Sequence, residues 1–242
     1  MSQQENENLA ETLVNSLGLQ NAPLAISFTQ ERLPGIELFT DAMPAPTADG
    51  RTGRVPAGCV FWMKSTGRTF STVAEDHANC SVGSVTHGLK TLEEVGSKSD
   101  IGTLVDAGWV APEMFPEIPA VKERFKYITY GPLREAESVP DVVFLRINAK
   151  QAMTISDAFP DLRFEGKPQC HIIAIAREQD KVAISVGCML SRVRTGMPNT
   201  EMTCAIPGSR LAEVVQQIKT TAVVDGSVAN YASEDSRRFE PR

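Results

Sequence analysis

Apolar residues recur at a helical spacing near both ends of the chain. Leucines at positions 9, 13 and 17 are four residues apart, which predicts an amphipathic helix over Glu5–Leu17, and Gly18 follows as a helix stop. Pro207–Lys219 (PGSRLAEVVQQIK) predicts a second helix with Pro207 in its first turn. Its apolar stripe consists of Leu211, Val214, Val215 and Ile218.

Short apolar runs between these helices predict strands. They are Pro23–Phe28 (PLAISF), Val142–Ile147 (VVFLRI) and Lys181–Gly187 (KVAISVG). The proline-rich stretch Leu33–Ala57 predicts a long surface loop, and the charged C-terminal end, within residues 223–242, predicts a loosely held tail. The pattern as a whole indicates a mixed α/β fold in a single domain of residues 1–242.

Composition narrows the function classes. A chain of 242 residues is long enough for a sizeable core, and a formal net charge of −6 argues against sequence-independent binding of nucleic acid. No uninterrupted apolar run approaches the roughly 20 residues needed to span a bilayer. The N-terminus is acidic and polar, unlike a signal peptide, so we expect a cytoplasmic protein.

The chain has 5 cysteines, and none stands in a C-x-x-C pair. In a reducing compartment structural disulfides are not expected. A structural zinc site usually draws on a close ligand pair, so zinc is only weakly supported. Each cysteine therefore needs its own explanation.

Two segments of the chain resemble one another and predict an internal repeat. Cys59–Gly88 and Cys170–Gly196 each begin with a cysteine and an apolar stretch, then pass through a polar turn into a β-prone run. A second cysteine follows in both, within the shared pattern C-x-[VL]-x-x-V-x-x-G. The first cysteines are 111 residues apart, and the second cysteines and the glycines are both 108 apart. We therefore expect two pseudo-repeated halves, about 20–130 and 138–222, each with a helix-turn-strand-helix unit that carries a cysteine pair.

The repeat predicts a shared cysteine site. Asn79 is a favourable N-cap, which would place Cys80 in the first turn of a helix, where free amides and the helix dipole stabilise a thiolate. An approximate two-fold would direct four thiolates to one place, and in a reducing compartment such a set indicates an iron–sulfur cluster. The predicted ligands of a [4Fe–4S] cluster are Cys59, Cys80, Cys170 and Cys188.

Alternatives to this site remain open. Cys204, in EMTCAIP, alternates with apolar residues on one face of a strand and is expected in the core, and Cys170 has an equally apolar setting. If Cys170 is only a core residue, Cys59, Cys80 and Cys188 would hold a cluster with one iron open for Lewis-acid chemistry.

Two further readings need no cluster. One is a cofactor-free enzyme with Cys80 as nucleophile and His77 or His87 as base. The other is a non-catalytic module that binds a small ligand between the halves. Arg192 and Arg194 are candidates for supplying positive charge to a cluster or an anionic substrate; His77 and Arg192 are the catalytic candidates. The expected partner is a small molecule or a redox protein, with a homodimer as the commonest assembly.

The chain resembles a known family, domain-of-unknown-function family 169, from about Leu9 to Lys219. The resemblance rests on the segments PLAISF, AEDHANCSVGSVTHGL, VAISVGCMLSR and EMTCAIPGSRLAEVV, in this order. Cys59, Cys80 and Cys188 match cysteine positions of the family. The family carries no settled activity, and its cysteine pattern suggests metal or redox chemistry.

Overall fold

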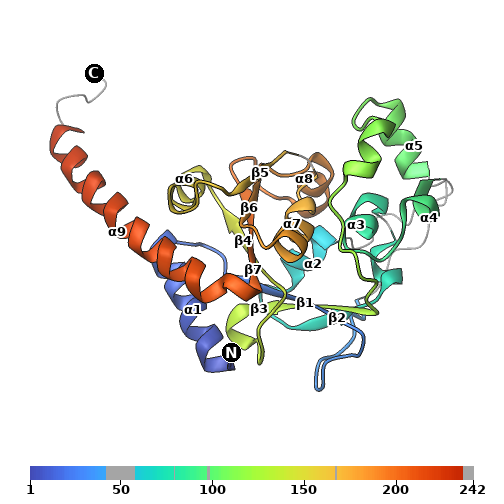
Figure 1. Cartoon of the computed structure of the whole chain (residues 1–242), viewed down its shortest axis with the longest axis horizontal. Helices are drawn as coiled ribbons and strands as arrows, with labels where there is room; N and C mark the ends of the chain where they lie inside the picture. Colours follow the sequence, from blue (N-terminus) through green and yellow to red (C-terminus); the bar gives the residue numbers. More distant parts are fainter. Residues whose placement is uncertain (42–57, 79, 97–98, 167, 237–242) are drawn as a thin grey trace.

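The strands of this protein form one mixed sheet in the order β2-β3-β1-β4-β7-β6-β5 (Figure 1). The structure is a computed structural model that describes residues 1–41, 58–78, 80–96, 99–166 and 168–236. Within these ranges the strands are β1 Leu24–Thr29, β2 Phe70–Thr72, β3 Tyr127–Pro132, β4 Val142–Ile147, β5 Arg163–Glu165, β6 Ala183–Ser185 and β7 Met202–Pro207. Neighbouring strands are antiparallel except β5 and β6, which are parallel. The predicted α/β class is confirmed.

Helices connect the strands and cover both faces of the sheet. They are α1 Gln3–Leu17, α2 Gly58–Lys64, α3 Ser81–Thr86, α4 Leu92–Gly96, α5 Ser99–Asp106, α6 Ala149–Ala158, α7 His171–Gln179, α8 Met189–Thr195 and α9 Leu211–Ser236. Four 3-10 turns complete the described elements: η1 Ala74–His77, η2 Pro112–Glu117, η3 Leu133–Glu135 and η4 Gly208–Arg210. No helix of the described ranges is long and apolar enough to cross a membrane.

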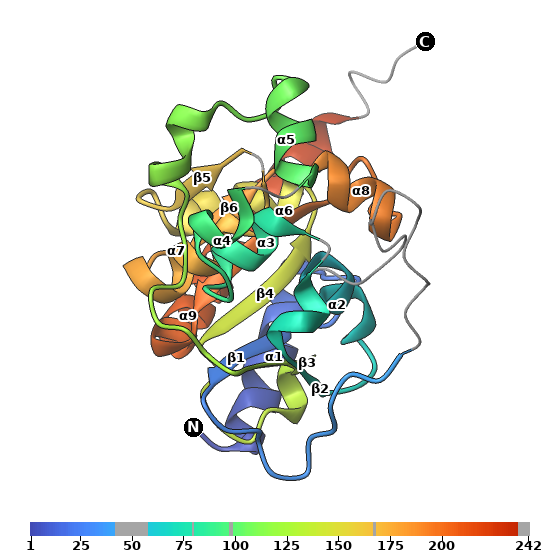
Figure 2. The same ribbon diagram turned by 90° about the vertical axis from the view of Figure 1, so that its right-hand side faces the viewer.

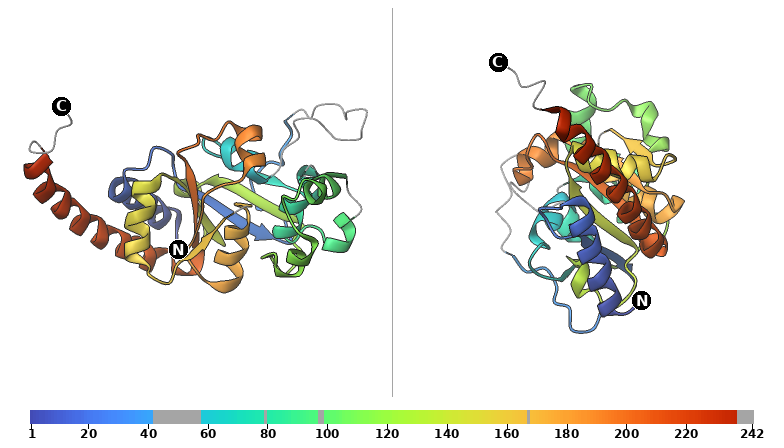
Figure 3. Two further views of the ribbon diagram at one scale, coloured as in Figure 1. Left: turned by 90° about the horizontal axis from the view of Figure 1, so that it is seen from above. Right: turned by 90° about the vertical axis from the view of Figure 1, so that its left-hand side faces the viewer.

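The alternation of side chains along β4 separates two hydrophobic cores. Val142 and Phe144 point to one face, where α2, α3 and α7 cover the sheet. Val143, Leu145 and Ile147 point to the other face, against α1, α6 and α9. Figures 1 and 3 show the two helical layers on opposite sides of the strands, and Figure 2 looks onto the side that carries α2 to α5. β4 is therefore apolar except at Arg146, which pairs with Glu201, because both of its faces are covered.

The strand order is symmetric about the centre of the sheet. β1 and β4 lie side by side, with Leu24 opposite Phe144 in an antiparallel register. β3 and then β2 follow outward from β1, while β7 and then β6 follow outward from β4. The predicted halves 20–130 and 138–222 thus contribute their strands in the same spatial order, and β5 extends the second half. The duplication itself stays a prediction.

The predicted strand Val142–Ile147 and the first helix are confirmed, and Gly18 ends α1 with a left-handed φ of 64°. The helix predicted at Pro207 was misplaced, because Pro207 is the last residue of β7. The helix begins at Leu211 and extends far beyond Lys219, to Ser236. Most of the predicted tail is therefore helical, and the C-terminal part of α9 extends away from the sheet (Figures 1 and 3). Of the predicted loop over 33–57, residues 42–57 lie outside the described residues.

Candidate functional site

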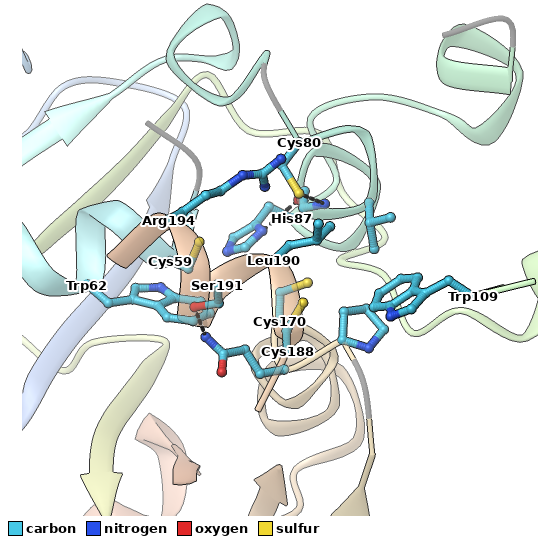
Figure 4. A pocket seen from close by; sticks show the side chains of 15 residues that line it. Cys59, Trp62, Cys80, His87, Trp109, Cys170, Cys188, Leu190, Ser191 and Arg194 are labelled. Carbon is cyan, nitrogen blue, oxygen red and sulfur yellow. Dashed lines mark hydrogen bonds between the residues drawn. The ribbon is translucent and has the colours of Figure 1, made fainter. Parts of the chain in front are cut away.

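The four cysteines that the repeat singles out line one cavity on the α2–α3–α7 side of the sheet (Figure 4). About 390 Å³ of this space is free of protein atoms, part of it open to solvent, and about 30 Å³ admits the centres of water molecules. Cys204 is fully buried in the core on the opposite face, as predicted. The sulfur-bearing residues of the cavity are Cys59, Cys80, Cys170 and Cys188.

The shared motif C-x-[VL]-x-x-V-x-x-G forms a short helix that begins at its cysteine and ends before its glycine. Cys80 is the N-cap of α3 and Cys188 the N-cap of α8. Gly88 and Gly196 follow these helices with left-handed φ angles of 69° and 68°, which glycine adopts without strain. The predicted N-cap Asn79 lies outside the described residues, and Cys80 occupies the cap rather than the first turn.

The two halves interlock around the cavity. Cys59 lies in the first turn of α2, and Cys170 is the N-cap of α7. Helix α2 of the first half contacts α8 of the second, and α3 of the first contacts α7 of the second. Each cysteine of one half therefore faces cysteines of the other half across the cavity.

Two of the thiols lie beside hydroxyl side chains of the other segment. Ser191 of α8 lies next to Cys59 and Thr86 of α3 next to Cys170, and each hydroxyl opposes the rise that burial causes in the pKa of its thiol. The Thr86 hydroxyl itself donates to the carbonyl oxygen of Gly83 at 3.1 Å. Ser191 also accepts a hydrogen bond from the side-chain amide of Gln169, at 2.7 Å. The sulfurs are thus set in a polar network rather than in purely apolar packing.

The other two thiols are held by backbone amides and by a cation. The N–H of Gly83 donates to the sulfur of Cys80 at 3.4 Å. Arg194 lines the cavity and hydrogen-bonds Cys80. The backbone amides of Ser191 and Leu190 lie near Cys188 and lower the pKa of its thiol, against the larger effect of burial.

Burial and mutual repulsion work against ionisation of these thiols. Burial raises the pKa of Cys59 to about 12, and the neighbouring charges of Cys80 and Cys188 add to the effect. Burial also raises the pKa of Cys170 and of Cys188, and in both cases a charge on Cys80 raises it further. For Cys204 the pKa is raised by burial alone. Four thiolates can coexist in this cavity only if additional positive charge enters it.

His87 contributes a neutral imidazole to the cavity wall. Its Nδ1 lies 2.7 Å from the carbonyl oxygen of Gly83, while Nε2 is buried and has no hydrogen-bond partner among the described residues. Burial lowers the pKa of His87 to about 4. Because Nδ1–H donates to the carbonyl, Nε2 carries the free lone pair and is an acceptor.

Two other buried side chains of the cavity wall have an unpartnered polar atom. These atoms, within the described ranges, are the indole Nε1 of Trp62 and the amide Oε1 of Gln169. Buried polar atoms without a partner are rare in proteins, because each costs roughly 1–3 kcal/mol. They indicate that a polar ligand or water occupies the cavity in the functional protein.

The two catalytic candidates lie outside this wall. His77 is buried beneath it, with Nε2 3.0 Å from the hydroxyl of Thr72. Arg192 donates to the carbonyl oxygens of Val186, Pro198 and Glu201 and thereby supports the loops around α8. Arg194 is the arginine that reaches the cavity. Helical phase gave no signal for it, because a helix that begins at Cys188 sets Arg192 about 40° and Arg194 about 120° from Cys188.

The described residues contain no group of three or more His, Cys, Asp or Glu side chains placed to hold a metal ion. A single tetrahedral ion with metal–sulfur bonds of ~2.3 Å needs sulfurs about 3.8 Å apart. The four-iron cube of the prediction instead separates its thiolates by roughly 6–7 Å. The arrangement of the described residues is thus not a ready-made site for one ion.

Comparison with known proteins gives one match. The model of domain-of-unknown-function family 169, described as "Uncharacterised ArCR", matches residues 12–217, which confirms the resemblance seen in the sequence. No curated protein and no solved structure matches the chain.

Proposed function

The chain belongs to domain-of-unknown-function family 169, and we propose that it is a protein that binds a [4Fe–4S] cluster in the cavity described above. One observation carries the proposal: four cysteines from four separate helix ends, two from each half, line the same cavity. The fifth cysteine of the chain, Cys204, lies on the other face of the sheet, where burial is the only influence on the pKa of its thiol. The ligands would be Cys59, Cys80, Cys170 and Cys188.

The donor set suits such a cluster. Four buried thiolates need compensating positive charge, and iron provides it, with Arg194 as an additional cation at Cys80. The hydrogen bond from the amide of Gly83 to the sulfur of Cys80 is the kind of contact that adjusts a cluster's potential. When bound, the cluster supplies one-electron redox chemistry, or Lewis-acid chemistry at an iron without a cysteine ligand.

The four-cysteine version is favoured over the three-cysteine version. Cys170 lines the cavity with the other three. Burial raises the pKa of its thiol, and charges on Cys80, Cys188 and Cys59 raise it further, whereas burial alone acts on Cys204. Cys170 therefore belongs with the ligands.

The free cysteines and the net charge also bear on the compartment and the partners of the protein. All five cysteines are free, which suits a reducing compartment, and we place the protein in the cytoplasm. Its partner would be a redox protein or a small molecule, because a net charge of −6 disfavours nucleic acid. A homodimer is the expected assembly.

The test is iron and sulfide analysis of protein purified without oxygen. We expect about four irons and four sulfides per chain and a broad absorbance near about 400 nm. Cys59→Ala, Cys80→Ala, Cys170→Ala and Cys188→Ala should each lower the iron content, while Cys204→Ala keeps it. A colourless protein that takes up no iron on anaerobic reconstitution refutes the proposal. Loss of iron in all variants except Cys170→Ala would favour the three-cysteine version.

A second candidate function is a cofactor-free enzyme with Cys80 as nucleophile. The contact of Cys80 with Arg194 favours it, since a guanidinium stabilises a reactive thiolate. His87 lies in the same cavity, and its Nε2 would accept the proton of the Cys80 thiol or hold that thiol in position by a hydrogen bond. This function requires that iodoacetamide modifies Cys80 at pH 7 faster than a free thiol of pKa about 8.5. Slower modification in iron-free protein eliminates it.

A further inference from the structure

A second and larger cavity shares a wall with the cysteine cavity. It lies between α3, α4, α5 and η2 on one side and β5 and α7 on the other, with about 440 Å³ open to the centres of water molecules. Val82, Trp109 and Pro168 line both cavities. Figure 4 shows Trp109 at the side of the cysteine cavity away from Cys59. The volume falls within the range of about 300–1,000 Å³ that is typical of small-molecule sites.

Most of this second cavity is apolar. Aliphatic and aromatic side chains form its body: Val82, Val85, Leu92, Val95, Ile101, Trp109, Val110, Met114, Phe115 and Ile118. Its charged and titratable side chains are Glu117 of η2 and a group of three at the end formed by β5 and α7, which we call the polar end: Arg163, Glu165 and His171. An apolar body with convergent polar groups at one end suits a molecule with one polar head.

His171 has an unused hydrogen-bonding atom at this polar end. The residue is 8% exposed, and its Nε2 is buried with no hydrogen-bond partner among the described residues. Its Nδ1 faces Glu165 at 3.6 Å, and Glu165 is held in place by Arg163 at 2.5 Å. This atom is a second observation, independent of the cavity volume, that points to a ligand.

The environment of His171 determines what Nε2 can bind. Burial lowers the pKa of His171, against the opposing effect of Glu165, so the ring is neutral near pH 7. A neutral ring that directs Nδ1–H toward a carboxylate leaves the lone pair on Nε2. The matching ligand group is a hydrogen-bond donor, and an apolar molecule most simply offers a hydroxyl.

We propose that this second cavity binds an apolar small molecule with one hydroxyl group, an alcohol or a phenol, whose hydroxyl donates to Nε2 of His171. The shared wall at Trp109 places such a ligand directly beside the cysteine cavity. The site would therefore present a substrate or an effector to the chemistry of that cavity. The proposal goes beyond the proposed function and stands whether or not the cysteines hold iron.

The test compares 4-butylphenol with butylbenzene, which has the same apolar body and no hydroxyl. The chain has 2 tryptophans, so a Trp62→Phe variant of the full-length protein leaves Trp109 as the fluorescence probe in the wall of the site. We expect the phenol to bind on the order of tenfold more tightly than the hydrocarbon, because the hydrocarbon leaves the buried nitrogen unpaired. His171→Phe keeps a ring of similar size and should abolish this difference.

Two further variants keep the test decisive if His171→Phe fails to fold. Glu165→Gln removes the charge that orients the imidazole and should narrow the preference for the phenol. Val110→Phe narrows the apolar body and should weaken both probes. If the two probes bind the Trp62→Phe protein with equal affinity, the proposed hydrogen bond from the ligand hydroxyl to His171 is wrong. If neither probe binds, the proposed binding site is wrong. Iron analysis of the same samples separates these outcomes from failure of the cluster proposal.

Discussion

Arg194 of α8 hydrogen-bonds the sulfur of Cys80 at the start of α3, so a cation from the second half of the chain meets a thiol from the first. The pair crosses the boundary between the two halves at the cavity wall. Charges on Cys80, Cys59 and Cys188 all favour the protonated guanidinium, while burial opposes it. The contact therefore depends on both halves being in place.

Replacing Arg194 tests the electrostatic side of this contact. Arg194→Met removes the cation and its hydrogen bond, so we expect the iron-free protein to react more slowly with iodoacetamide at Cys80 near pH 7. A lost hydrogen bond to a charged group is worth roughly 1.5–3 kcal/mol, which corresponds to a slowing by about tenfold to a hundredfold. Peptide mass spectrometry over a time course measures the rate. Arg194→Lys keeps the charge and is the control, and an equal rate in both variants contradicts the electrostatic role.

Gly58 is expected to tolerate no side chain, because His87 packs directly against it. A Cβ at Gly58 would lie 2.9 Å from Cε1 of His87. Overpacking of this kind costs about 1–3 kcal/mol, so Gly58→Ala should lower the free energy of unfolding in urea by that amount. Gly67→Ala, where a Cβ meets nothing within 4 Å, is the matched control. In a His87→Ala background, Gly58→Ala should lower the free energy of unfolding by much less. An unchanged decrease would show that contact with His87 is not its cause.

The buried histidines predict that the iron-free protein loses stability on acidification. Burial lowers the pKa of His87 to about 4 and that of His77 well below its usual value of 6.5. The unfolded chain therefore binds more protons than the folded chain below about pH 6.5, and stability falls as the pH drops from there toward about 4. Each histidine contributes up to about 1.4 kcal/mol per pH unit in this window.

Urea denaturation at several pH values between about 6.5 and 4.5 measures this effect. His77→Gln removes one of the two groups and should reduce the slope of stability against pH by about one proton. If the variant and the parent protein give the same slope, His77 is not neutral in the folded state. Thr72, its hydrogen-bond partner, is the site of a control variant, Thr72→Val, which should keep most of the slope.

Gly208 is expected to be indispensable at the junction of β7 and η4. A Cβ at this position would lie 1.6 Å from the backbone oxygen of Pro140, which cannot move away as a flexible side chain would. Gly208→Ala should therefore cost at least about 3 kcal/mol of unfolding free energy or prevent folding. Gly226→Ala, in α9 with nothing within 4 Å, should be neutral or stabilising by about 0.5–1 kcal/mol. A mild effect of Gly208→Ala would contradict the described approach of the two segments.

The best sequence predictions were those in which one local pattern carried the whole signal. Val142–Ile147 could be predicted to the residue, because a strand covered on both faces needs a mostly apolar run. The shared motif has the same local structure at both places: Cys80 and Cys188 each cap a helix, and Gly88 and Gly196 follow with a left-handed φ, while the duplication itself stays a prediction. Such signals depend on neighbouring residues alone.

The failures occurred where distant contacts decide the structure. Pro207 suits the first turn of a helix, but its register opposite Val142 extends β7 to this residue, and no local pattern reveals that register. The helix was predicted to end at Lys219 and to be followed by a loosely held tail, yet α9 continues to Ser236. Arg192 is closer than Arg194 to Cys188 in helical phase, about 40° against about 120°, but contacts with the loops around α8 hold Arg192 away from the cavity.

The antiparallel pairing of β1 with β4 has a consequence for the biosynthesis of the protein. The residues that line the cysteine cavity lie between Gly58 and Arg194 in the sequence. The sheet beneath the cavity is complete only when β7 has paired with β4. A group held by all four thiols would bind only after the chain as far as β7 has been synthesised. The β1–β4 pair, which carries none of the cysteines, joins the segment with Cys59 and Cys80 to the segment with Cys170 and Cys188, so separation of these two strands would also separate the two cysteine pairs.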